Sequence, residues 1–163
     1  MNNLSFHITD ITANSIRANA SEIGLSVEEQ DTRIVIRITD NGSGMDAETA
    51  RRVTNPFYTT RTTRKVGLGL PFLIQNAEQT GGSVTLTSEP GKGTEVRAVF
   101  HSDHIDCPPW GDLPGTVALL ITGNPEINVC FEYRSGETGY SISTNEIKEI
   151  LDGVPLSYPK VML

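Results

Sequence analysis

The sequence predicts an α+β fold of helices and antiparallel hairpins, with a small β-hairpin/helix extension after it. Residues 2–20 carry apolar side chains at helical spacing. Residues 23–38 form two alternating runs separated by a turn. This order of helix and hairpin recurs through residue 100, and a hairpin with one half-exposed face fits a sheet covered by helices on one side.

The first helix is expected to have two functional faces. Its core-facing residues would be Leu4, Ile8, Ile11, Ser15 and Ala18. A polar row on the neighbouring face would consist of His7, Asp10, Asn14 and Arg17. A helix of this kind can be buried on one side and present polar groups to a ligand on the other.

The elements that follow are predicted from their boundaries. A short helix at 46–53 is capped by Asp46, a polar basic loop covers 57–65, and a second strong helix ends at Gly81-Gly82. Strands at 83–88 and 94–100 are joined by the turn 89–93.

A change in composition after residue 101 predicts a boundary. We expect a domain of residues 1–101 and a small α/β extension of residues 102–163. The extension is predicted to contain a hairpin of 116–122 and 127–134, a strand at 139–142 and a helix at 144–151 capped by Thr144.

The composition limits the partners. A net charge of −7 disfavours nucleic acid, because binding to phosphates needs a basic surface. No apolar run approaches the ~20 residues of a membrane helix, and the N-terminus does not have the pattern of a signal peptide. Two cysteines without a CxxC pair suggest a reducing compartment. We therefore expect a cytoplasmic protein that does not act on membranes.

The stretch Asp40-Asn41-Gly42-Ser43-Gly44 closes the second predicted strand. Glycine lets a ligand approach the backbone closely, and a carboxylate at a strand end can accept a hydrogen bond. Residues 42–47 also fit the dinucleotide form GxGxxA. That form needs a buried parallel strand and an acid about 20 residues later, whereas Arg37 interrupts the run and no such strand follows. We therefore favour a purine held by Asp40.

Four boxes in order strengthen this interpretation. They are Asp10-x-x-x-Asn14, Asp40-x-Gly42-x-Gly44, Gly67-Leu68-Gly69-Leu70 and Gly93-Thr94. Over residues 1–100 the sequence resembles the histidine-kinase-like (GHKL) ATPases, which include gyrase, the Hsp90 chaperone, sensor histidine kinases and MutL. The resemblance implies a site for ATP and Mg²⁺ on a two-layer α/β sandwich, in which helices lie on one face of a mixed, mainly antiparallel sheet.

The resemblance also implies roles for individual residues. Asn14 would bind Mg²⁺, which prefers oxygen ligands. Asp40 would accept the adenine amino proton, with the Gly42 and Gly44 backbone near the base, and Thr94 would join this network. Asp10 occupies the place of the general-base glutamate of hydrolytic members but is one methylene shorter; it could instead orient water on the metal, or be a surface acid.

The loop before the second glycine box resembles a short ATP lid. Phe57 would anchor it, and Lys65, with Arg61 or Arg64, would meet a phosphate. Gly67, Leu68, Gly69 and Leu70 would supply backbone amides at a helix start. Lys65 and Val66 replace the glycine and small hydroxyl usual in the family, and the sequence contains no P-loop.

One cluster lies outside these boxes. His101, His104 and Cys107, together with nearby acids, offer zinc-ligand types, but their spacing is irregular and a polar linker is the favoured interpretation.

The sequence leaves the fate of the γ-phosphate open. We expect a kinase-like regulatory domain that phosphorylates a histidine or serine of a partner protein. The alternatives are a slow ATPase that acts as a conformational switch and a nucleotide sensor without catalysis. The chain resembles stand-alone members more than complete sensor kinases, since it leaves no room for a phosphoacceptor hairpin. It is also similar, tail included, to small ATP-binding proteins of anaerobic bacteria encoded with iron hydrogenases.

Overall fold

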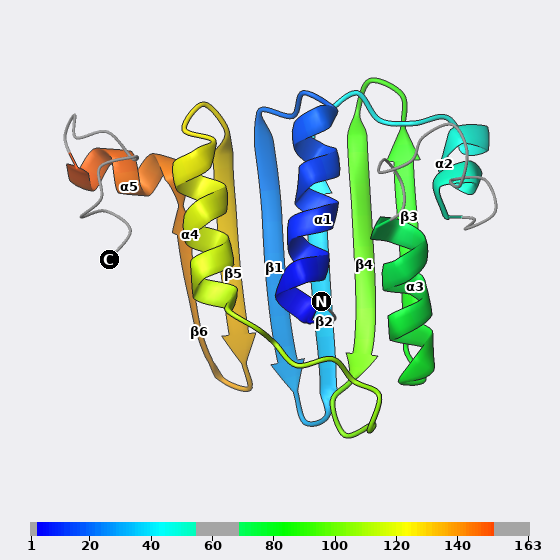
Figure 1. Ribbon diagram of the computed structural model, residues 1–163. Helices are drawn as coiled ribbons and strands as arrows, with labels where there is room; N and C mark the ends of the chain where they lie inside the picture. The colour runs from blue at the N-terminus through cyan, green and yellow to red at the C-terminus, as the bar shows by residue number, and fades with distance from the viewer. Residues whose placement is uncertain (1–2, 55–68, 152–163) are drawn as a thin grey trace.

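The computed structural model describes residues 3–54 and 69–151 (Figure 1). Its elements, in order, are α1 (Leu4–Arg17), β1 (Glu22–Gln30), β2 (Arg33–Asp40), α2 (Ala47–Thr54), α3 (Gly69–Gln79), β3 (Ser83–Glu89), β4 (Gly93–His101), α4 (Leu113–Gly123), β5 (Asn128–Ser135), β6 (Thr138–Ser143) and α5 (Thr144–Leu151).

The described strands form one six-stranded sheet in the order β3-β4-β2-β1-β5-β6. The β1–β5 pair is parallel and the other four pairs are antiparallel. Helices α1, α3 and α4 lie side by side on one face of the sheet (Figure 1). The predicted two-layer α+β architecture is therefore confirmed.

The alternation of β1 and β2 places their apolar residues under the helices. Leu25, Val27 and Ile36 are 3% exposed or less, whereas Arg37 points away and forms an ion pair of 3.1 Å with Glu95 on β4. This period of two decides which face of the sheet is covered.

Helix α1 buries more of its surface than the sequence predicts. Leu4, Ile8 and Ile11 enter the core as expected. The prediction that His7 belongs to the polar row is wrong, because its side chain is 1% exposed and its ring lies 5.4 Å from that of Phe72. His7 Nε2 is 2.8 Å from Asn76 Nδ2, and Nδ1 has no partner among the described residues. His7 therefore joins α1 to α3 inside the core.

Residues 113–123 form a helix, so the predicted hairpin of 116–122 with 127–134 is wrong. The Asp112 side chain accepts a hydrogen bond of 3.0 Å from the Gly115 amide, and a proline occupies the first turn. Val117, Leu120 and Ile121 are buried at helical spacing. Helix α4 connects β4 to β5, which extends the sheet beside β1.

The final helix has the expected range but a different cap. Ser143 Oγ accepts a hydrogen bond of 3.2 Å from the Glu146 amide and donates one of 3.0 Å to its carboxylate. Thr144, the predicted cap, is fully buried and accepts a hydrogen bond of 2.9 Å from the Val129 amide. Thr144 therefore fixes α5 to β5.

The segment between β4 and α4 holds the start of α1. The Leu4 and Ser5 amides donate to the carbonyls of Pro109 and Trp110 at 2.8 and 3.0 Å. Trp110 Nε1 donates to Glu29 on β1 at 2.8 Å, and the Tyr133 hydroxyl of β5 donates to the other oxygen of the same carboxylate. The orphan amides at the start of α1 are thus satisfied by a segment that is itself fixed to the sheet.

Among the helices of residues 3–54 and 69–151, none combines the length and the apolar character that a membrane span needs.

The burial of His7 generates a prediction about stability. Burial lowers the pKa of the His7 imidazole from 6.5 to about 4. Between these values the unfolded chain binds a proton that the folded protein excludes, so this contribution is complete above pH 6.5 and is lost as the pH falls to 4. We expect wild type to lose about 3 kcal/mol more than His7→Gln between pH 7 and pH 4.

Urea unfolding at each pH measures this difference, and glutamine retains a hydrogen-bonding group for Asn76. Parallel pH profiles of the two proteins, or a His7 imidazole resonance that titrates near 6.5 in folded wild type, would contradict the assignment.

Candidate functional site

A cavity of about 340 Å³ opens between α1, the end of β2 and the start of β4. Among its lining residues are five that the sequence predicts, namely Asn14, Asp40, Gly44, Leu70 and Thr94. Apolar side chains of Ile11, Ile38, Val53 and Val96 complete much of the wall. Such a cavity, mainly apolar with a few convergent polar groups, is typical of a site for a flat organic ring.

Asp40 is the polar group most firmly held in this cavity. Ser15 Oγ donates a hydrogen bond of 2.6 Å to Asp40 Oδ2, and the Gly42 amide donates one of 2.9 Å to Oδ1. A carboxylate offers about four lone-pair sites, so acceptor capacity remains for a ligand. The side chain is therefore oriented before any ligand binds.

The glycines of the Asp40 box are explained by close contacts within the protein. Gly44 has φ +70°, and a Cβ there would lie 1.9 Å from the Glu89 carbonyl oxygen. A Cβ on Gly42 would lie 2.7 Å from the Ala18 Cβ. The Ser43 amide also donates to the Ala18 carbonyl at 2.9 Å. Small residues let the loop pass between α1 and the β3–β4 turn and so shape the rim of the cavity.

Asn14 and Arg17 lie at the solvent side of the same cavity. The Asn14 amide oxygen accepts a hydrogen bond from the Arg17 guanidinium. The sequence placed Arg17 in the polar row of α1 without giving it a role. Its cation now stands beside the candidate metal ligand, where a phosphate would also be attracted.

Asp10 lies one turn before Asn14 and faces the first turn of α3. A Cβ built on Gly69 would be 3.0 Å from Asp10 Cβ and 3.6 Å from its carboxylate oxygen. Burial raises the pKa of the Asp10 carboxyl, and the charge of Arg17 partly opposes this. The structure thus places Asp10 outside the cavity lining, at the positive end of a helix.

The predicted lid falls outside the described residues. Phe57, Lys65, Gly67 and Leu68 belong to this segment, as do Arg61 and Arg64. Leu70, in the first turn of α3, is 3% exposed and lines the cavity.

Two hydroxyls complete the site and were missed in the sequence. Ser15 was assigned to the core face of α1, and Ser88 of β3 was given no role. Ser88 Oγ accepts a hydrogen bond of 2.8 Å from the Met45 amide and lies 2.8 Å from Thr94 Oγ1. No sequence pattern marks either residue as part of a site, because serine is equally common on solvent-exposed surfaces.

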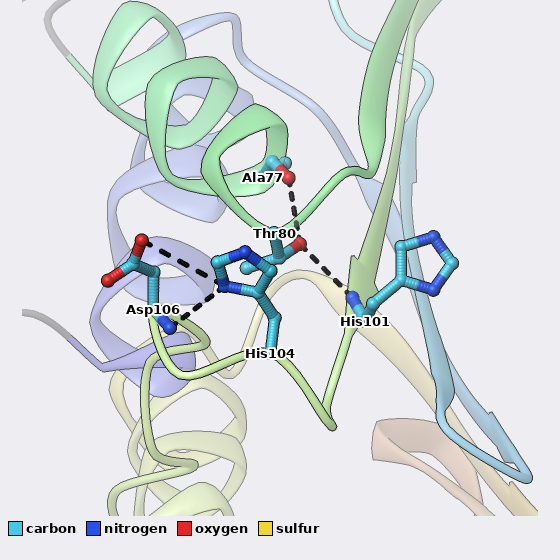
Figure 2. A network of polar contacts seen from close by, with 5 residues as sticks. All are labelled: Ala77, Thr80, His101, His104 and Asp106. Atoms are coloured by element: carbon cyan, nitrogen blue, oxygen red, sulfur yellow. Dashed lines mark hydrogen bonds and ion pairs between the residues drawn. The ribbon is translucent and has the colours of Figure 1, made fainter.

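The residues considered as a metal cluster form a turn. His104 Nδ1 accepts a hydrogen bond of 3.0 Å from the Asp106 amide, while the His101 ring points away from it (Figure 2). Thr80 accepts a hydrogen bond from the His101 amide and donates one to the Ala77 carbonyl (Figure 2). Within residues 3–54 and 69–151, no three His, Cys, Asp or Glu side chains gather as a metal site would require.

The rim geometry predicts that Gly44 tolerates no side chain. We expect Gly44→Ala to lower the free energy of unfolding by about 3 kcal/mol, because of the overlap with the Glu89 carbonyl and the left-handed backbone. Gly91→Ala is the matched control, since its φ is also positive at +78° but nothing lies within 4 Å of the new Cβ. It should cost about 1–2 kcal/mol. Equal losses in urea unfolding would refute the close contact.

Known kinases are similar to this chain over part of its length. The sensor histidine kinase YxdK of Bacillus subtilis (strain 168) is 29% identical over 104 residues, which are 60% of this chain and 32% of YxdK. Sporulation kinase C of the same organism is 30% identical over 61% of this chain and 23% of its own length. The sensor kinase CckA of Brucella abortus (strain 2308) is 34% identical over 55% of this chain and 10% of CckA. The chain thus spans a third or less of these relatives.

A solved structure supports the fold alone. The N-terminal domain of a DNA repair protein superposes with a TM-score of 0.63 at 18% identity, covering 88% of this chain and 52% of that one.

Residues 3–104 match the model of the histidine kinase-, DNA gyrase B- and HSP90-like ATPases. With its Asp40 box and six-stranded sheet, the chain belongs to this ATPase family.

Proposed function

We propose that the protein binds Mg²⁺-ATP in the cavity and acts as a kinase-like regulatory domain. The carrying observation is the carboxylate of Asp40, held by Ser15 and Gly42 at the end of a mainly apolar cavity. A fixed carboxylate accepts a hydrogen bond from the 6-amino group of adenine, and apolar walls accommodate the faces of the ring. Gly42 and Gly44 shape the rim, and Thr94 stands beside Asp40 on the neighbouring strand.

The residues at the open end suit a triphosphate and a hard cation. The Asn14 amide oxygen would hold Mg²⁺, which takes few protein ligands when phosphate oxygens complete its shell. The donor chemistry fits, although Asn14 must first exchange its hydrogen bond with Arg17. Bound there, the cation would neutralise phosphate charge. Arg17 is then free to pair with a phosphate oxygen.

The α3 start would complete the phosphate end. Gly69 and Leu70 begin a helix whose unpaired amides suit an anion. Phe57, Lys65, Gly67 and Leu68 remain proposed lid and phosphate contacts on the strength of the family boxes. The same applies to the division into a nucleotide-binding unit of residues 1–101 and an extension of 102–163 that supports α1.

Transfer of the γ-phosphate to a histidine or serine of a partner protein is the proposed activity. The support is the similarity to proteins named histidine, sporulation and sensor kinases.

Slow ATP hydrolysis is the second candidate, and one observation favours it. Burial raises the pKa of Asp10, which suits a general base that takes a proton from water. A nucleotide sensor without catalysis is the third candidate.

ATP labelled at the γ-phosphate distinguishes these activities. Calorimetry should first detect ATP binding that strengthens when Mg²⁺ is added. We then expect label on a partner protein incubated with the domain. Label released as free phosphate, falling about 100-fold or more in Asp10→Asn, would identify an ATPase instead. Asp103→Asn, an exposed acid at the other end of β4, is the control.

Two results would count against the proposal. Tight Mg²⁺-dependent binding with neither labelled product would support the sensor, and absence of ATP binding would refute the site itself.

A further inference from the structure

Thr94 lines the cavity, and the hydrogen bonds around its hydroxyl decide what that hydroxyl offers a ligand. Thr94 is the direct cross-strand neighbour of Asp40 on β2 and of Ser88 on β3. Ser88 Oγ lies 2.8 Å from Thr94 Oγ1, 2.8 Å from the Met45 amide nitrogen and 3.0 Å from the Gly93 carbonyl oxygen. Ser88 therefore contacts three groups with one hydroxyl.

The direction of these hydrogen bonds follows from counting protons. A serine hydroxyl has one proton to donate and two lone pairs. The Met45 amide can only donate, so it uses one lone pair, and the Gly93 carbonyl can only accept, so it receives the proton. The second lone pair of Ser88 is left for Thr94, which must donate its own proton to Ser88. Thr94 then has only lone pairs left for a ligand.

Ser15 has its proton committed in the same way. Its hydroxyl, 2% exposed, donates to Asp40 Oδ2 at 2.6 Å. The wall formed by Asp40, Ser15 and Thr94 consequently faces the cavity with hydrogen-bond acceptors.

We propose that Ser88 is a specificity-determining positioning residue, which fixes the Thr94 proton and so makes this wall select a 6-amino purine over a 6-oxo purine. The proposal rests on the proposed function. A 6-amino group donates to the acceptors of the wall, whereas a 6-oxo group at the same place sets its lone pairs against theirs. Without Ser88 the Thr94 hydroxyl can turn and donate to a 6-oxo group.

The ratio of the affinities for ATP and ITP tests this role, because the two nucleotides differ at the 6-position and its adjacent ring nitrogen. We expect wild type to prefer ATP about 100-fold or more. Ser88→Ala should reduce this preference about tenfold. Ser88→Thr keeps the hydroxyl and should restore the preference, and Ser83→Ala, an exposed serine on the same strand, should leave it unchanged. If the alanine variant fails to fold, Ser88→Cys replaces it in the test. The thiol is a weak acceptor, so the ratio of affinities should again fall.

The outcomes separate the two proposals. If wild type binds neither nucleotide, the proposed function fails. If wild type binds ATP but the alanine and cysteine variants lose affinity for both nucleotides equally, Ser88 is a structural residue only and the inference is overturned. A wild type that binds ATP and ITP alike overturns it as well.

Discussion

The position of α1 on the sheet is the constraint on which the site depends. Leu4, Ile8 and Ile11 bury the helix, and the carbonyls of Pro109 and Trp110 hold its first turn. At the other end Ser15 reaches Asp40. A shift of one helical turn, about 5.4 Å, would remove Ser15 from Asp40 and move Asn14 out of the cavity. The segment between β4 and α4 therefore serves the site, although none of the described residues 102–151 lines the cavity.

Hydroxyl groups position the Asp40 carboxylate and the glycine loop at this end of the cavity. Ser15 orients one carboxylate oxygen, and Ser88 joins the glycine loop to β4 through Met45 and Thr94. A buried hydroxyl that is fully hydrogen-bonded adds polarity without the desolvation cost of another ion. Arg17 and Asn14, the proposed metal ligand, stand instead at the solvent side of the cavity, where the proposed function places the triphosphate.

Local patterns in the sequence predicted most of the sheet, since alternation in residues 23–38 and the turns near 31 and 91 depend only on neighbours in the chain. The run Val117–Ile121 was assigned to a strand because a short apolar run with β-branched residues also fits a strand. Its helical state is decided by the Asp112 cap and by packing against α1. Ser88 could not be assigned, because its hydrogen bonds depend on the pairing of β3 with β4 and on the contact with Met45, which is 43 positions away in the chain. His7 was misassigned because a histidine at helical spacing carries no sign of its burial.

The affinity of the protein for ATP after one substitution tests the central claim, that Asp40 holds the adenine ring. In Asp40→Asn an amide replaces one acceptor oxygen with a donor, so calorimetry should find ATP binding weakened about tenfold or more. Asp31→Asn makes the same chemical change in the exposed β1–β2 turn at the other end of the sheet and should leave the affinity as it was. Equal ATP affinity in Asp40→Asn and wild type would contradict the account.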